Sequence, residues 1–216
     1  MPAINLLSRY PKSKRNIQAR LENKEQNRAL AMKFDKEYFD GTREQGYGGF
    51  KYDRRWIPVA EDIVRHYNLK AGDRVLDIGC AKGFLVKDLM LVCPGLEVFG
   101  IDISPYAVIN CESEVVGRLH IGDARKLPFP DKSFKIALGI NVIHNFDYDD
   151  CLLSISEIQR IVTTGAYIQV DAYKNENDRQ LFLDWVLTAK THGTPEFWEN
   201  LFQAADYEWD YYWTVL

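Results

Sequence analysis

Short apolar segments alternate along the chain with stretches whose apolar residues recur at helical spacing. The apolar segments cover residues 74–78, 97–102, 118–122, 134–140 and 166–171. The stretches between them are long enough for crossover helices, and strands joined by such crossovers run parallel. The apolar character of 74–78 is typical of a strand buried on both faces of a sheet. The pattern therefore predicts an α/β fold with a mostly parallel sheet.

Helices account for much of the remaining sequence in this prediction. A helix that begins near Pro58, a residue favoured in the first turn, would place Ile57, Ala60, Ile63, Val64 and Tyr67 on one face. Further helices are expected after Ser104-Pro105 and at 13–35, 84–92, 148–161, 177–190 and 195–205. The alternation of Trp209, Tyr211, Trp213 and Val215 predicts a last strand over about 208–216.

Size and composition limit the class of protein. The chain has 216 residues, 46% of them hydrophobic, which is enough for one well-buried domain. No apolar run approaches membrane-spanning length and the first residues lack the apolar core of a signal peptide, so we expect a cytoplasmic protein that does not enter a membrane. Four dispersed cysteines without C-x-x-C spacing predict free thiols and give no support for a metal site.

Charge is unevenly distributed. The net charge of −4 argues against a general nucleic-acid binder. The first 36 residues nevertheless carry nine Lys and Arg against three acids. This basic stretch is either one side of a solvated amphipathic helix, a contact for a phosphate-bearing substrate, or a contact for a membrane surface.

Polar residues end the predicted strands just where the loops begin. They are Asp77, Asp102, Asp123, Asn141 and Asp171. The carboxyl ends of parallel strands meet at one edge of a sheet, where ligands of open α/β sheets bind. A row of hydrogen-bond acceptors there favours a ligand that is rich in hydroxyl and amine groups and carries positive charge, rather than a pyrophosphate.

A glycine-containing turn, Gly79-Cys80-Ala81-Lys82-Gly83, joins the strand 74–78 to the next helix. Such a turn allows a ligand to lie against the backbone at a helix N-terminus. The dinucleotide fingerprint requires small residues at the first, third and sixth positions, and Phe84 occupies the sixth. The spacing therefore argues against NAD, although the two glycines could also simply form a turn.

Four segments together resemble the motifs of class I S-adenosylmethionine-dependent methyltransferases. VLDIGCAKGF is similar to the first motif and VFGIDIS to the second; GDARKLPFPDKSFKIALGINVIHN and EIQRIVTTGAYIQV resemble the later ones. The resemblance covers roughly residues 55–173, and the core is similar to that of ubiquinone and menaquinone methyltransferases. It implies a Rossmann-like, doubly wound sheet with helices on both faces, a helical N-terminal extension and a C-terminal antiparallel strand. The implied domains are 1–56, a helix and lid segment, and 57–216, the cofactor-binding domain.

The resemblance also implies a role for particular residues, with S-adenosylmethionine as cofactor and S-adenosylhomocysteine as product. Asp77, Gly79, Cys80, Ala81 and Gly83 would line the amino-acid end of the cofactor. Asp102 would hold the ribose, since a carboxylate can accept both hydroxyl protons. Ile103, Asp123 and Ala124 would contact the adenine, and Asn141 would close the pocket.

Catalytic and acceptor-binding residues are expected around this core. His144 is the candidate general base, with Asp171 and Tyr173 beside it; a structural histidine, a turn acid and a packing ring are the alternatives. Residues 38–56, which we call the lid segment, combine glycines with aromatic rings. The predicted acceptor contacts are Tyr47, Phe50, Tyr52 and Trp56 from this segment, with Trp185 and His192 from beyond residue 173. These rings could also pack together without touching an acceptor.

The expected activity is methyl transfer to the oxygen or nitrogen of a small molecule (EC 2.1.1.-), such as a sugar, an amine or a biosynthetic intermediate. Neither the (N/D)PPY motif of amino-methylating DNA enzymes nor a Pro-Cys nucleophile is present, which argues against a nucleic-acid partner. Two alternatives remain: a methyltransferase that reaches RNA or protein through the basic N-terminal helix, and a non-catalytic cofactor-binding subunit. If the family's last strand is missing, the open sheet edge would allow a homodimer.

Overall fold

A computed structural model describes residues 3–11 and 16–215 of the chain. Its centre is a six-stranded sheet in the order β3-β2-β1-β4-β5-β6, and every neighbouring pair is parallel. The strands are β1 (Arg74–Ile78), β2 (Glu97–Asp102), β3 (Leu119–Ile121), β4 (Phe134–Ile140), β5 (Val162–Ala172) and β6 (Asp210–Val215). The doubly wound, mostly parallel fold expected from the sequence is thereby confirmed.

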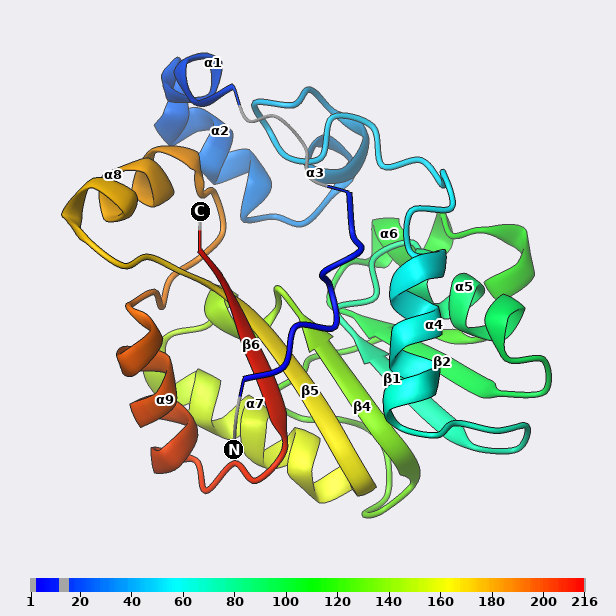
Figure 1. Ribbon diagram of the computed structural model, residues 1–216. Helices are drawn as coiled ribbons and strands as arrows, with labels where there is room; N and C mark the ends of the chain where they lie inside the picture. Colours follow the sequence, from blue (N-terminus) through cyan, green and yellow to red (C-terminus); the bar gives the residue numbers. More distant parts are fainter. Residues whose placement is uncertain (1–2, 12–15, 216) are drawn as a thin grey trace.

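Helices cover both faces of the sheet (Figure 1). On one face lie α4 (Ile57–His66) and α5 (Phe84–Val92), and on the other lie α7 (Tyr148–Ile161) and α9 (Pro195–Ala204). Adjacent strand residues enter opposite cores: Val75 packs with α4 and α5, whereas Leu76 packs with α7 and α9. This division follows from the two-residue period of a strand, and it makes both faces apolar.

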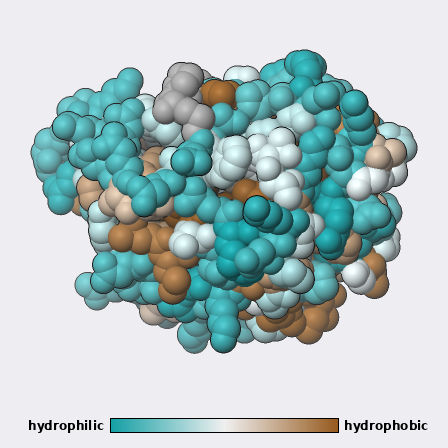
Figure 2. Space-filling model, turned by 90° about the horizontal axis from the view of Figure 1, so that it is seen from below, coloured by the Kyte–Doolittle hydropathy of each residue, from teal (hydrophilic) through white to brown (hydrophobic). Residues whose placement is uncertain are grey.

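The remaining helices gather at the carboxyl ends of the strands (Figure 1). They are α1 (Ile17–Leu21), α2 (Lys24–Ala31), α3 (Lys36–Asp40), α6 (Pro105–Ile109) and α8 (Glu176–Trp185), with short 3₁₀ turns at Ser113–Val115 (η1) and Ile143–Asn145 (η2). The opposite end of the molecule, at the amino ends of the strands, shows mainly hydrophilic side chains with separate apolar patches (Figure 2).

The expected antiparallel C-terminal strand is wrong, because β6 runs parallel to β5. The chain leaves β5 at its carboxyl end and passes through α8 and α9 before it enters β6. This crossover returns the chain to the amino end of the sheet, so β6 must run in the same direction as β5. The alternating pattern of 208–216 predicts a strand but contains no information on its direction.

Two expected helices are shorter than their sequence patterns suggest. Residues 13–15 of the stretch 13–35 lie outside the described residues. Of the rest, only α1 and α2 are helical; they are separated at Asn23, whose φ of 55° is left-handed, and residues 32–34 form a turn. The stretch 177–190 is helical only to Trp185, the last residue of α8. Residues 186–190 instead run along the site described below.

The N-terminal residues 3–11 pack onto the sheet. Leu6 is buried beside Ile63 of α4 and Tyr167 of β5, and its backbone N–H donates to the Tyr167 hydroxyl. The N–H of Ile4 donates to the carbonyl of Tyr211 in the last strand. The segment therefore covers part of a sheet face and reaches β6. The boundary at 56/57 and the homodimer both stay predictions.

Candidate active site

Two adjoining cavities open at the carboxyl ends of the strands. The larger, of about 980 Å³, extends from Asp77 to Trp185, and the smaller, of about 330 Å³, surrounds Asp102 and Asp123. Both are lined by Gly79, Ala81, Ile140 and Asn141 of the sheet edge and by Tyr38 and Tyr47. The two spaces therefore meet where β1 and β4 end.

The loop after β1 has a backbone conformation that few residue types adopt easily. Gly79, Ala81 and Gly83 have φ angles of 71°, 50° and 77°, all left-handed. A Cβ atom at Gly79 would lie 2.2 Å from Cγ2 of Val142, so glycine is required there for space as well as for conformation. Gly83 is the N-cap residue of α5 and lines neither cavity. It thus shapes the loop without contacting the cavity space.

Asp102 holds this loop in place. One carboxylate oxygen accepts from the N–H of Ala81 and the other from the N–H of Ser104, both at 2.8 Å. Burial raises the pKa of Asp102, and these two hydrogen bonds oppose the rise. The side chain lines the smaller cavity, as do its neighbour Ile103 and the residues Asp123 and Ala124 after β3.

Asp123 is paired with a cation at the far end of the smaller cavity. Arg125 forms a two-pronged contact with the Asp123 carboxylate and also reaches Asp150, at 2.6 Å in each case. The hydrogen bonds from Arg125 lower the pKa of Asp123. Asp123 is therefore ionised, and its carboxylate is held in place by Arg125.

Asp77 contributes a carboxyl group of a different kind to the larger cavity. It is buried, and it accepts no hydrogen bond from the residues that the structure describes. Burial, together with the charge of Asp102, raises its pKa to about 8. A cation placed beside Asp77 would restore its ionised form, because an opposite charge favours the carboxylate.

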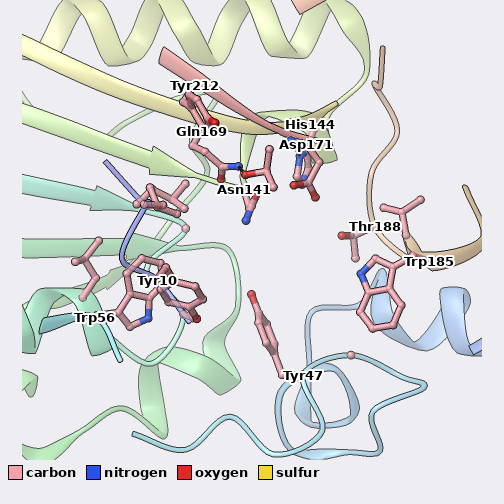
Figure 3. A pocket seen from close by; sticks show the side chains of 18 of the residues that line it. Tyr10, Tyr47, Trp56, Asn141, His144, Gln169, Asp171, Trp185, Thr188 and Tyr212 are labelled. Carbon is pink, nitrogen blue, oxygen red and sulfur yellow. Dashed lines mark hydrogen bonds between the residues drawn. The ribbon is translucent and has the colours of Figure 1, made fainter. Parts of the chain in front are cut away.

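His144 and Asp171 lie together on the larger cavity, beside Asn141 (Figure 3). The N–H of Asp171 donates to Nδ1 of His144 at 3.4 Å. Burial lowers the pKa of His144, and the charge of Asp171 opposes this. A neutral ring that accepts at Nδ1 carries its proton on Nε2. In this arrangement His144 is a hydrogen-bond donor.

Aromatic side chains form the outer walls of the larger cavity. Tyr47 projects from the lid segment with its hydroxyl toward Asn141, while Trp185 lies on the far side (Figure 3). Trp56 packs against Tyr10 with ring centroids 4.5 Å apart, and Phe50 stacks on Phe84 at the same separation. These four predicted acceptor contacts therefore line the cavity.

Three other predicted residues lie outside both cavities. The Tyr52 hydroxyl donates to the buried Asp88, and its ring lies 3.9 Å below the Lys87 ammonium. Tyr173 and His192 contact each other, with 3.4 Å between the hydroxyl and Nδ1, and both rings pack on Phe182. They were expected at the site because of their positions along the chain, but their side chains are used for packing.

Several lining residues were not predicted. Tyr10 and its neighbours Leu7 and Ser8 come from the N-terminal segment, and Thr188 comes from the stretch after α8. Gln169 on β5 lines the larger cavity and is 1% exposed. Only Gln169 had a sequence signal, since it is a polar residue within the apolar strand segment IQVD.

Part of the chain matches a known protein family. Residues 76–170 match the family of methyltransferase domains. This part of the chain is a class I S-adenosylmethionine-dependent methyltransferase domain. Its cofactor is S-adenosylmethionine, as the four motifs imply.

Curated relatives of this chain are also methyltransferases, and a solved structure has the same fold. Demethylmenaquinone methyltransferase of Geobacillus kaustophilus is 31% identical over 120 residues, 52% of this chain and 50% of that protein. The 2-methyl-6-phytyl-1,4-hydroquinone methyltransferase of Synechocystis is 30% identical over 181 residues, 73% and 55% of the two chains. The chain thus spans about half the length of these relatives. The protein bound by the Trm112 methyltransferase activator in a Haloferax volcanii complex shares the fold, with a TM-score of 0.56, 23% identity and coverage of 71% and 68%.

Among the described residues, no helix is both long and apolar enough to cross a membrane. In the same ranges, no cluster of three or more His, Cys, Asp or Glu side chains is arranged to hold a metal ion.

Proposed function

We propose that this protein transfers the methyl group of S-adenosylmethionine to an oxygen or nitrogen atom of a small molecule. The observation that supports this proposal is the junction of the two cavities at Gly79, Asn141 and Tyr47. The smaller cavity has the residues that a nucleoside requires, and the larger leaves room for an acceptor next to the cofactor's amino-acid end.

The residues present fit the cofactor. Asp77, a buried carboxyl without a hydrogen-bond partner among the described residues, suits an ammonium group. Asp102 suits a ribose diol, and Ile103, which is 52% exposed, offers an apolar surface for a base next to Asp123. Bound S-adenosylmethionine supplies an electrophilic methyl group on a charged sulfur.

The chain's own contribution to methyl transfer is chiefly positioning. Holding a nucleophile in line with the methyl group can supply roughly 7–11 kcal/mol of the barrier. Tyr47, Trp56 and Trp185 would hold the acceptor between aromatic walls, and the Nε2–H of His144 would donate to it. For His144 to act as a general base, its proton must first leave Nε2, which would require protonation at Nδ1 and loss of the bond from the Asp171 N–H.

The proposed class of acceptor is supported by the aromatic walls of the larger cavity and by the relatives. Two of them are named for demethylmenaquinone and for a phytyl hydroquinone, both small molecules. A macromolecular acceptor was suggested by the basic N-terminal stretch. Arg20, Lys24 and Arg28 of that stretch instead donate to backbone carbonyls of residues 183–189.

The test combines binding and turnover. Calorimetry with S-adenosylhomocysteine should show one site per chain, and incubation with methyl-labelled S-adenosylmethionine and a metabolite extract should yield a labelled small molecule that mass spectrometry identifies. Absence of any binding to S-adenosylhomocysteine would refute the proposal. Label found only in RNA or protein would replace the small-molecule acceptor with a macromolecule.

A further inference from the structure

Asp40, at the end of α3, connects the lid segment to the loop after β1. We call this loop, residues 79–83, the cofactor loop. The Lys82 ammonium donates to both oxygens of the Asp40 carboxylate, at 2.8 and 2.6 Å. The same carboxylate accepts from the hydroxyl of Tyr106 in α6 at 2.7 Å and from the N–H of Phe50 at 3.2 Å. Three donor groups from three parts of the chain thus converge on one acid through four hydrogen bonds.

The Asp40–Lys82 pair is shielded from water. The side chains are 26% and 10% exposed, and the backbone of Lys82 lies between Ala81 and Gly83 in the cofactor loop. Removing one member of a shielded pair leaves the other charge without compensation, which is costlier than losing a surface ion pair. The pair therefore strongly favours one arrangement of the lid relative to the loop.

Residues of the lid segment before and after Asp40 line the two cavities. Tyr38 and Tyr47 line both, and Phe39 lines the smaller. Phe39 is buried against Ala81 of the cofactor loop and Ala107 of α6. Asp40 and Lys82 themselves line neither cavity, so any effect they have on ligands must act through these neighbours.

We propose that Asp40 and Lys82 are positioning residues that couple occupation of the cofactor cleft to ordering of the lid residues 38–50. The inference rests on the proposed function, since it assigns the loop 79–83 to the cofactor. A ligand that fixes the loop fixes Lys82, Lys82 holds Asp40, and Asp40 holds Tyr38 and Tyr47 over the cavities. Because coupling is reciprocal, an ordered lid must in turn strengthen cofactor binding.

Calorimetry with S-adenosylhomocysteine tests this coupling without knowledge of the acceptor. Asp40→Asn and Lys82→Met should each raise the dissociation constant about tenfold, the effect of losing one charge-assisted hydrogen bond. Lys82→Arg, which keeps the charge, should restore most of the affinity. The Asp40→Asn/Lys82→Met double variant should bind no more weakly than either single variant, because the two residues act through each other.

Hydrogen exchange gives a second, independent measurement. Bound S-adenosylhomocysteine should slow amide exchange over residues 38–50 in the natural protein, and this protection should be lost in Asp40→Asn. Lys87→Met is the matched control: Lys87 is a partly buried lysine on α5 that is paired with Glu112 at 2.8 Å and lines neither cavity. It should leave both affinity and protection unchanged.

The outcomes separate the two proposals. A natural protein that fails to bind S-adenosylhomocysteine would overturn the proposed function itself. Normal binding in the natural protein, with unchanged affinity and unchanged lid protection in Asp40→Asn and Lys82→Met, would overturn the coupling alone. Additive losses in the double variant would likewise show that the two residues act separately.

Discussion

At the scale of single residues, two buried carboxyl groups with different surroundings decide what the cavities can bind. Asp102 uses both oxygens on backbone N–H groups, so its charge is stabilised and its orientation is fixed. Asp77 has no such donor among the residues that the structure describes, and its pKa rises to about 8 through burial and the nearby Asp102. The first carboxylate is ready to accept hydrogen bonds, whereas the second keeps its proton at neutral pH unless a cation lies beside it.

Replacing Asp102 tests the first of these roles. Asp102→Ala should weaken S-adenosylhomocysteine binding at least about 50-fold, since a charged acceptor contributes roughly 1.5–3 kcal/mol and the Ala81 turn is also released. Titration calorimetry measures the affinity, and circular dichroism checks the fold. Asp88→Asn, at a buried acid outside both cavities, is the control and should bind normally. Unchanged affinity in Asp102→Ala would rule out its assignment to the ribose.

The raised pKa of Asp77 predicts a pH dependence of binding. Below about pH 8 the free protein holds a proton on Asp77, and an ammonium group bound beside it would displace that proton. Affinity for S-adenosylhomocysteine should therefore increase between about pH 6 and about pH 7.5, by at most about tenfold per unit. Calorimetry in buffers of different ionisation enthalpy should detect the released proton.

The raised pKa of Asp77 also makes the stability of the folded protein depend on pH. The unfolded chain ionises this acid near pH 3.9, while the folded protein retains the proton to about pH 8. The contribution of Asp77 to the free energy of unfolding is therefore present at low pH and is lost as the pH rises through this window. Asp77→Asn should remove both effects; a variant with the same pH dependence of binding as the natural protein would show that another group titrates.

Residue types in the sequence pointed to most residues that line the smaller cavity near the loop after β1, but to only part of the lining of the larger cavity. Asp77, Asp102 and the glycines of the loop are fixed by strand ends and by a turn, which are local features. Tyr10 reaches the larger cavity because the N-terminal segment crosses the sheet, a contact between residues that are distant in sequence. Local patterns hold no information on such contacts.

At the scale of elements, the basic N-terminal helices bind the end of another helix. Arg20 of α1 donates to the carbonyl of Trp185, and Lys24 of α2 donates to that of Leu183, both in the last turn of α8. Carbonyls in a last helical turn lack intrahelical partners, and cations there also interact favourably with the helix dipole. The charge pattern indicated an amphipathic helix, but the partner of its basic residues depends on where α8 lies.

Arg20 is the central residue of this contact. Its guanidinium lies 3.8 Å above the Trp185 ring and also donates to the carbonyls of Arg43 and Gly46. Arg20→Met should lower the free energy of unfolding by about 2 kcal/mol, because several charge-assisted bonds are lost at a buried position. Amide exchange over residues 182–189 should accelerate. Urea unfolding and hydrogen-exchange mass spectrometry measure the two effects.

The exposed Lys36 provides the comparison for Arg20. Lys36→Ala should change neither the unfolding midpoint nor the exchange of α8, because this side chain is exposed and forms no hydrogen bond or ion pair with the described residues. If Arg20→Met left exchange over 182–189 at its natural rate, the contact with α8 would have no energetic role.

At the scale of the whole molecule, the sheet is covered by segments from both ends of the chain. Strands β1, β2 and β4 and helices α5 and α7 have the bounds expected from the sequence, since each has a strong local period. The direction of β6 and the path of residues 3–11 depend on how distant segments pack. Leu6 fills the sheet face beside Ile63 and Tyr167, so the N-terminal segment belongs to the same core as the helices α4 and α5.

A large-to-small substitution at Leu6 tests whether this segment stabilises the whole domain. Leu6 is 6% exposed, so Leu6→Ala should lower the free energy of unfolding by about 2–3 kcal/mol, through lost burial and the cavity left behind. Urea unfolding measures the change. Leu91→Ala on α5, where the side chain is 55% exposed, should cost far less. Equal effects at the two positions would mean that residues 3–11 contribute little to the fold. A large effect at Leu6, accompanied by weaker acceptor binding, would instead link the covered sheet face to the wall that Tyr10 and Trp56 build.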